Sequence, residues 1–241
     1  MTLKKFLIGT IASFGLAWLL LVIIPFVLMR NPEPVEFQEA ADEQTGTFVA
    51  KTHGRVVDGL NVYLANGCAQ CHTQVIRPTY AGTELWRADW AGLATDEDRG
   101  DTRRESNVFD YHGLDYAPIG QTRIGQDLSN LAVRMDQRFP KSPAAAEQWL
   151  YKHLFNARDF PELGWSVCPP MPFMFDKKPV SGQGPSSEAI QIDAKGRQIV
   201  PNQDARALIS YLMSLRHDHK VPAAINYSPP APAAAPKPAG S

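Results

Sequence analysis

The residues best suited to chemistry are two cysteines and a histidine in the run Cys68-Ala69-Gln70-Cys71-His72. The chain holds three cysteines and six histidines among 241 residues, so a Cys-x-x-Cys-His pattern is expected by chance in about one such chain in a thousand. Two cysteines three positions apart lie on one side of a helical turn, where both sulfurs can form thioethers with one porphyrin. The pattern predicts one covalently bound haem c, attached at Cys68 and Cys71. A simple dithiol beside a chance histidine is the alternative.

The iron of such a haem needs axial ligands from the protein. His72 follows Cys71 directly, so it is carried to the porphyrin and offers a neutral imidazole nitrogen to the iron. Proximal histidines usually donate their second ring N–H to a backbone carbonyl. We expect that carbonyl between Gln121 and Leu131, in a loop that leads into an apolar segment.

Met171 is the expected second axial ligand. A proline stands on each side of it, which disfavours helix and strand and predicts a rigid extended loop for the thioether. An axial methionine raises the haem potential relative to a second histidine, and Phe173 and Phe175 are expected to keep water from the iron. His72 and Met171 are therefore the predicted metal ligands.

Three other side chains are weaker ligand candidates. Met174 lies near Met171. His153 lies on one face of a predicted helix from Ala144 to Arg158 and is either a second ligand or a packed histidine. Cys168 could ligate as a thiolate, although a small buried hydrophobe is the commoner role of a free cysteine.

The N-terminal segment is predicted to anchor the chain in a membrane. Phe6 to Met29 is free of charge, and as a helix it would reach about 36 Å against a hydrocarbon core of about 30 Å. Lys4 and Lys5 precede it and only Arg30 follows, which keeps the N-terminus cytoplasmic. We expect a single-pass protein of the inner (cytoplasmic) membrane with its main domain on the periplasmic side. A cleaved signal peptide is the alternative, with an unusually long apolar core and no small-x-small cleavage pattern.

The predicted domains follow from composition and periodicity. We expect an anchor helix over residues 1–30, an acidic, proline-marked linker over 31–54, a haem domain over 55–220 and a Pro/Ala-rich disordered tail over 221–241. Apolar residues at helical spacing predict a helix from Arg55 to Asn66, ended by Gly67, and a last helix opened by Asn202. The stretch 96–105 is expected to be a solvated charged loop, with a docking surface as the alternative. The stretch 176–201 is expected to be a long surface excursion.

The charge balance excludes one class of function. With 24 basic and 25 acidic residues the net charge is -1, so the chain lacks the basic footprint of a nucleic-acid-binding protein.

Four motifs together resemble a known family. They are Gly67-Cys68-x-x-Cys71-His72-Thr73-Gln74-x-Ile76-Arg77-Pro78, Glu105-Ser106, Arg123-x-Gly125-x-Asp127-Leu128 and Met171-Pro172. In this combination the chain resembles the monohaem cytochrome c subunit (subunit II) of cbb3-type cytochrome c oxidases. The His-Thr-Gln-x-Ile-Arg-Pro extension is much more specific than the haem motif alone.

The resemblance implies an all-α fold: one transmembrane helix plus an extracytoplasmic class I type cytochrome c domain. It also implies an electron-transfer subunit without catalytic residues of its own, which passes electrons to the catalytic haem b and copper subunit beside other cytochrome c subunits. Cys68 and Cys71 would hold the haem, and His72 and Met171 would bind its iron. Arg77 and Arg123 would belong to the cofactor site. Our own expectation is that one of these arginines forms a bidentate pair with a haem propionate, an exposed surface charge being the alternative.

The chain departs from the family at Gln126, where a proline is usual, and in the stretches 96–105, 139–144 and 176–201. Neighbouring classes therefore stay open. They are the anchored cytochrome c subunit of a nitric oxide reductase, a free-standing membrane-bound electron carrier, and a haem sensor or peroxidase-like enzyme in which Met171 does not bind the iron.

Overall fold

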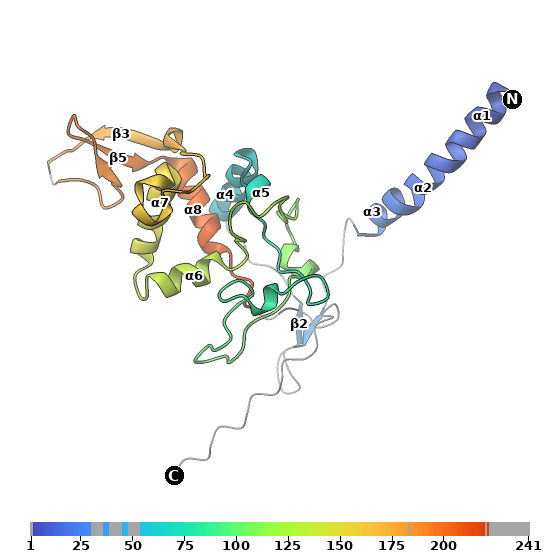
Figure 1. Ribbon diagram of the computed structural model, residues 1–241, viewed down its shortest axis with the longest axis horizontal. Coiled ribbons are helices and arrows are strands. Elements are labelled where there is room, and N and C mark those ends of the chain that lie inside the picture. The colour runs from blue at the N-terminus through green and yellow to red at the C-terminus, as the bar shows by residue number, and fades with distance from the viewer. Residues whose placement is uncertain are drawn as a thin grey trace, which may run out of the picture. The chain divides into compact units, whose positions relative to one another are not determined.

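The computed structural model describes residues 2–29, 36–38, 45–47, 54–182, 184–219 and 221 (Figure 1). The chain divides into two compact units, residues 1–49 and 50–241, and each is described by itself. Most of the predicted linker and nearly all of the predicted tail lie outside the described residues. The described chain is mainly helical, with few strands.

The first unit contains a single long apolar helix. It runs through α1 (Leu3–Thr10), α2 (Leu16–Trp18) and α3 (Ile24–Met29), which two π-helical turns join (Figure 1). It spans 26 residues from Leu3 to Leu28 with a mean hydropathy of 2.6, and none of the residues in its most apolar window is buried. The helix is long and apolar enough to cross a membrane, as the sequence predicted; a signal sequence shares these properties.

A short antiparallel ladder lies within the predicted linker. Strand β1 (Glu36–Gln38) pairs with β2 (Thr45–Thr47), with Phe37 opposite Gly46. The described part of this segment is therefore locally paired, where the sequence predicted only an extended linker.

The second unit is built around five helices. In chain order they are α4 (Gly54–Ala65), α5 (Cys68–Cys71), α6 (Leu131–Arg138), α7 (Pro143–Asn156) and α8 (Gln203–Ser214). Helices α4 and α8 pack against each other, and α6 and α7 both contact α8 (Figure 1). The predicted helices near 55–66 and 144–158 are confirmed to within two residues at each end, and α6 forms from the segment that the sequence marked only as apolar.

Helix α8 closes the core as its sequence indicates. The side chain of Asn202 accepts a hydrogen bond from the Ala205 N–H at 3.0 Å and caps the first turn. The apolar residues at helical spacing are all buried: Ala205, Leu208, Ile209, Leu212 and Leu215. The predicted cap and the predicted buried face are both confirmed.

The crossing of α4 and α8 depends on a glycine. A Cβ atom at Gly59 would lie 2.1 Å from the carbonyl oxygen of Ala207 and 2.6 Å from the Cβ of Tyr211. Both neighbours are fixed by helix α8, so the space cannot be made by rotating a side chain. The two helices approach this closely only because Gly59 has no side chain.

We therefore expect Gly59→Ala to separate the helices and to lower the free energy of unfolding by about 1–3 kcal/mol, as overpacking of a core does. Urea denaturation checks this value. Gly54→Ala is the matched control, since nothing lies within 4 Å of its Cβ position at the start of the same helix. Equal stability of the two variants would contradict the close crossing.

Most described residues of the stretch 176–201 are exposed, as expected of a surface excursion, but the stretch also forms a sheet that the sequence did not predict. Strands β3 (Phe175–Pro179), β5 (Arg197–Pro201) and β4 (Gln191–Ile192) form an antiparallel sheet in the order β3-β5-β4. Four consecutive residues of β5, from Gln198 to Pro201, are buried. A strand that is buried on both faces lacks apolar–polar alternation, so periodicity does not reveal it. The second unit is accordingly mainly helical with one small sheet, and the expectation of an all-α fold is corrected on this point.

The charged stretch 96–105 is also more than a solvated loop. Arg99 donates to the Oδ2 of Asp218 at 2.8 Å, and the side chain of Asp218 is only 1% exposed. Arg104 forms a bidentate pair with the buried carboxylate of Asp110. The prediction of a solvated loop is wrong for Arg104, whose side chain is 11% exposed. Arg99 is 43% exposed, as predicted, although its partner Asp218 is buried beyond α8.

Candidate functional site

Helix α5 is the single turn that carries both cysteines of the motif. Gly67 begins it in the left-handed conformation, with φ of 70°, which glycine adopts without a Cβ penalty. Cys68 and Cys71 are both half-buried, and Cys68 packs against the hydrophobic core. Burial raises the pKa of the Cys68 thiol to about 11. The two sulfurs thus belong to one helical turn, as the spacing predicted.

The imidazole of His72 is held by a backbone carbonyl. Its Nδ1 lies 2.7 Å from the carbonyl oxygen of Gln126, which can only accept, so Nδ1 carries the hydrogen and Nε2 keeps its lone pair. Burial lowers the pKa of His72, which favours the neutral, ligating form. The predicted carbonyl between residues 121 and 131 is confirmed, and Gln126 supplies it without the proline usual in the resembled family.

Two glycines give the His72 backbone and ring their space. A Cβ at Gly125 would lie 2.2 Å from Cε1 of the imidazole and 2.6 Å from Nδ1. A Cβ at Gly120, where φ is 87°, would lie 2.1 Å from the His72 carbonyl oxygen. The Gly125 N–H donates to the Cys71 carbonyl at 2.8 Å. The loop therefore lies directly against the residues that the haem motif presents.

The extension beyond His72 is tied to the other motifs by buried hydrogen bonds. Thr73 donates from its hydroxyl to Oδ2 of Asp127 at 2.6 Å, and the Val75 N–H reaches the same oxygen at 3.0 Å. Ile76, which is fully buried, exchanges hydrogen bonds with Ser106 in both directions. The motifs that are separated in sequence thus converge on one extended segment.

Gln74 connects this segment to the last helix. Its Oε1 accepts from the hydroxyl of Tyr211 on α8 at 2.8 Å, and its backbone carbonyl accepts from the hydroxyl of Tyr111 at 2.5 Å. Gln74 is itself buried. Its Nε2 is buried without a partner among the described residues, so the two tyrosine hydroxyls are what tie Gln74 to the rest of the domain.

Arg77 and Arg123 both bind the same carboxylate, that of Glu84, whose side chain is 3% exposed. Arg123 reaches both carboxylate oxygens and also donates to the Val75 carbonyl at 2.7 Å and the Thr73 hydroxyl at 2.8 Å. The forked face of Arg123 is therefore used within the protein. That either arginine pairs with a haem propionate stays a prediction, and the described contacts do not favour it.

Glu84 gives a prediction with a defined pH dependence. Burial alone would raise the pKa of its carboxyl group. Hydrogen bonds from Arg123 and Arg77 lower that pKa by more than burial raises it, so the net pKa lies below its ordinary value. Glu84→Gln should cost about 1.5–3 kcal/mol of unfolding free energy at pH 7, the range for hydrogen bonds to charged groups. Because the folded-state pKa is depressed, this difference is present above the ordinary carboxyl pKa and disappears as pH falls through the folded value.

Denaturant melts of both proteins from pH 7 to pH 3 measure this difference. Glu162→Gln is the control, because Glu162 pairs with Arg138 at 3.0 Å on the surface with both side chains about half exposed, a type of pair worth about 0–1 kcal/mol. A constant difference across the pH range would contradict the role of the ionised Glu84.

Met171 lies in the hydrophobic core. Its side chain is 7% exposed, and its N–H donates to the Leu154 carbonyl of α7 at 2.9 Å. Met171 lies outside helix and strand, as predicted, but its backbone is not extended, with φ of -119° and ψ of 56°, and a 3-10 turn from Pro172 to Met174 follows at once. Met174 is also buried.

The two phenylalanines near Met171 behave differently. Phe175 is buried and packs edge-to-face on Phe155, with ring centroids 5.3 Å apart. Phe173 is 65% exposed. Phe175 therefore belongs to the apolar surroundings of Met171, whereas the shielding expected of Phe173 is not seen.

His153 lies in the same region on α7. Its ring stacks on Trp149 with centroids 5.1 Å apart. Burial lowers the pKa of His153 to about 4, and the charges of His72 and Arg138 act in the same direction. His153 is therefore neutral near pH 7, and the alternative that it ligates stays open. Cys168 is half-buried, and burial raises the pKa of its thiol.

Several buried nitrogens around these residues lack a partner among the described residues. They are Nε2 of Gln74, Nη1 of Arg134, Nε1 of Trp149 and Nδ1 of His153. Buried polar groups are normally hydrogen-bonded, so these atoms indicate a missing acceptor or donor. Together with the His72 ring and the two cysteines on one turn, they fit a haem with carboxylate side chains. No cluster of three or more His, Cys, Asp or Glu able to hold a bare metal ion occurs in the described part of the chain.

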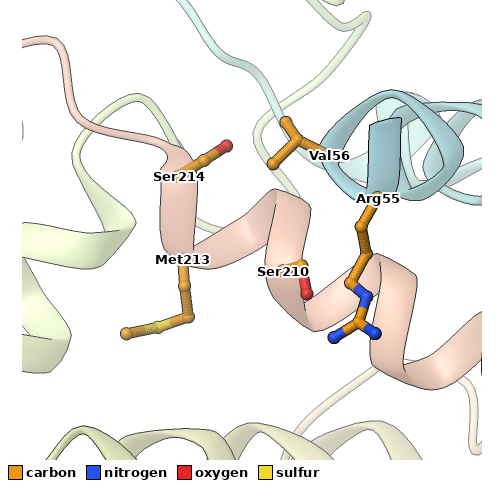
Figure 2. Close-up of a pocket in the computed structure, with 5 residues that line it drawn as sticks. All are labelled: Arg55, Val56, Ser210, Met213 and Ser214. Carbon is orange, nitrogen blue, oxygen red and sulfur yellow. The ribbon is translucent and has the colours of Figure 1, made fainter. Parts of the chain in front are cut away.

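A surface hollow of about 500 Å³ lies at the junction of α4 and α8. Arg55 and Val56 of α4 and Ser210, Met213 and Ser214 of α8 line it (Figure 2). Both serine hydroxyls already donate to carbonyls of their own helix. None of the residues predicted to bind the haem lines this hollow.

Comparison with known proteins adds no assignment, since no family model and no curated protein matches the chain.

Proposed function

We propose that this protein is a membrane-anchored c-type cytochrome that transfers electrons. More specifically, we propose that it is the monohaem subunit of a cbb3-type haem-copper terminal oxidase in aerobic respiration, relaying electrons to the catalytic subunit. The observation that carries the proposal is the His72 imidazole, held at Nδ1 by the Gln126 carbonyl directly after the two cysteines of α5. With Nδ1 occupied in this way, Nε2 keeps the neutral lone pair that ligation of an iron requires.

The chain's own residues would divide the work as follows. Cys68 and Cys71 would hold the haem covalently, and His72 and Met171 would bind its iron. When bound, the haem supplies one-electron redox chemistry. With both axial positions filled, the subunit by itself neither binds oxygen nor turns over a substrate, and electrons pass by outer-sphere transfer.

The position in the cell follows from the first helix. Lys4 and Lys5 hold the short N-terminus in the cytoplasm, so the second unit lies on the periplasmic side of the inner membrane. The partners are the catalytic haem b and copper subunit and the other cytochrome c subunits of the complex. The convergence of the His-Thr-Gln-x-Ile-Arg-Pro segment with Ser106 and Asp127 supports this membership over a generic cytochrome.

The test is purification of a tagged copy from its native membrane in mild detergent, followed by identification of its partners and a reduced haem spectrum. A large haem b and copper subunit with oxygen-reducing activity is the expected result. Co-purification of a nitric oxide reductase subunit would transfer the protein to that complex, and a haem c spectrum without partners would make it a free-standing carrier. Ready binding of carbon monoxide by the ferrous protein would indicate the sensor or peroxidase-like class.

A further inference from the structure

Arg134 is a half-buried cation without an ion pair among the described residues. It lies in the first turn of α6, and its Nη2 donates to the backbone carbonyl of Asp127 at 2.7 Å. Its Nη1 is buried and has no hydrogen-bond partner among the described residues. No carboxylate of the described chain lies within ion-pair distance of it. By contrast, Arg77 and Arg123 share Glu84, and Arg138 pairs with Glu162.

An unpaired guanidinium in this position is costly. Removing a charge from water is unfavourable unless a counter-charge and hydrogen bonds replace the lost hydration, and arginine does not escape by losing its proton. Burial lowers the pKa of Arg134, and the charges of Asp127 and Asp89 oppose this from beyond ion-pair distance. The site therefore lacks one anion that the described residues do not provide.

The position of Arg134 relative to His72 identifies the missing group. Asp127, whose carbonyl Arg134 holds, directly follows Gln126, whose carbonyl holds the His72 ring. A haem ligated by His72 would bring two propionates, and these are its only anionic side chains.

We infer that Arg134, rather than Arg77 or Arg123, binds a haem propionate through its free Nη1–H. The inference rests on the proposed haem function. Arg134 is a positioning residue in this scheme: it joins the loop that holds His72 to the edge of the porphyrin. It also keeps the propionate ionised and places a positive charge beside the iron.

The experiment is a redox titration of the full-length protein in detergent from pH 5 to pH 8, for wild type, Arg134→Gln and Arg138→Gln. Loss of the positive charge disfavours the electron-rich ferrous state. At pH 8 we expect the equilibrium constant for reduction to fall about tenfold in Arg134→Gln, which is about 59 mV for a one-electron couple. The freed propionate should then titrate, so the potential of the variant should rise as pH falls.

The wild-type potential should be nearly constant over this range, and Arg138→Gln, four residues along the same helix, should match wild type. A wild-type potential that varies by a full proton per electron, or an Arg134→Gln profile equal to that of Arg138→Gln, would overturn the inference. If Arg134→Gln does not retain haem, Arg134→Lys provides the test: it keeps the charge and should keep a flat profile, and a sloping one would overturn the inference.

Failure of the proposed function can be distinguished from failure of the inference about Arg134. A pyridine haemochrome spectrum first establishes whether wild type carries haem c. Its absence overturns both the function and the inference, whereas a haem-bearing protein whose potential ignores Arg134 overturns the inference alone.

Discussion

Met171→Ala is expected to leave haem c attached at Cys68 and Cys71 while opening one axial position of the iron. The thioether is buried beside α7, and alanine can neither reach the iron nor fill the space. We expect loss of the methionine ligand-field signature, rapid binding of carbon monoxide to the ferrous protein and a lower reduction potential. Truncation of the core side chain should also cost about 2–5 kcal/mol of stability.

Met174→Ala separates ligation from packing. Met174 is at least as buried as Met171 and belongs to the same core, so its truncation should cost similar stability but leave the ligand-field spectrum unchanged. If Met171→Ala kept the wild-type spectrum, the axial assignment would be wrong. In that case a spectral change in His153→Gln would identify the stacked histidine of α7 as the ligand.

Gly125→Ala is expected to disrupt the binding of iron by His72. The new methyl group would overlap the His72 ring, which the Gln126 carbonyl holds from the same loop. Either the ring or the loop must move, and both movements break the hydrogen bond that orients the imidazole. Loss of such a supporting contact typically weakens metal ligation about 10–100-fold. The haem content per chain and the pH at which the His–iron bond is lost both measure this change.

Gly164→Ala is the matched control for this substitution. Its Cβ position meets only the Pro161 carbonyl oxygen, at 3.8 Å, which is an ordinary contact. We expect it to bind haem as wild type does. If Gly125→Ala also bound haem as wild type does, the loop could move aside without loss of ligation, and glycine would not be required next to the His72 ring.

Helical periodicity and capping residues correctly predicted the elements that depend only on residues close together in sequence. The cap at Asn202 and the apolar face of α8 are written within about fourteen consecutive residues, so periodicity and capping suffice to locate them. The His72–Gln126 hydrogen bond could also be anticipated, although it joins distant residues, because the chemistry of a ligating imidazole requires a carbonyl. Sequence reasoning succeeded where a chemical requirement or a helical period limits the choices.

The features that were missed depend on burial, which short-range patterns do not reveal. Asp110 follows Arg104 by only six residues, yet nothing in the sequence indicates that its carboxylate is buried, and β5 has no alternation because both of its faces are covered. Glu84 was not singled out, since a lone glutamate carries no sign that two arginines converge on it. The one signal available was the presence of Arg77 and Arg123 in the quoted motifs.

The close packing of Gly59 against Ala207 has a consequence for the order of events during biosynthesis. Almost 150 residues separate these two positions, and at ordinary rates of translation the ribosome needs on the order of ten seconds to make them. Throughout that interval the segment with Cys68 and Cys71 exists without its closing helix. Both thiols are then open to modifying enzymes and to stray oxidants alike, and completion of α8 ends that period for Cys68 by completing the core against which it packs.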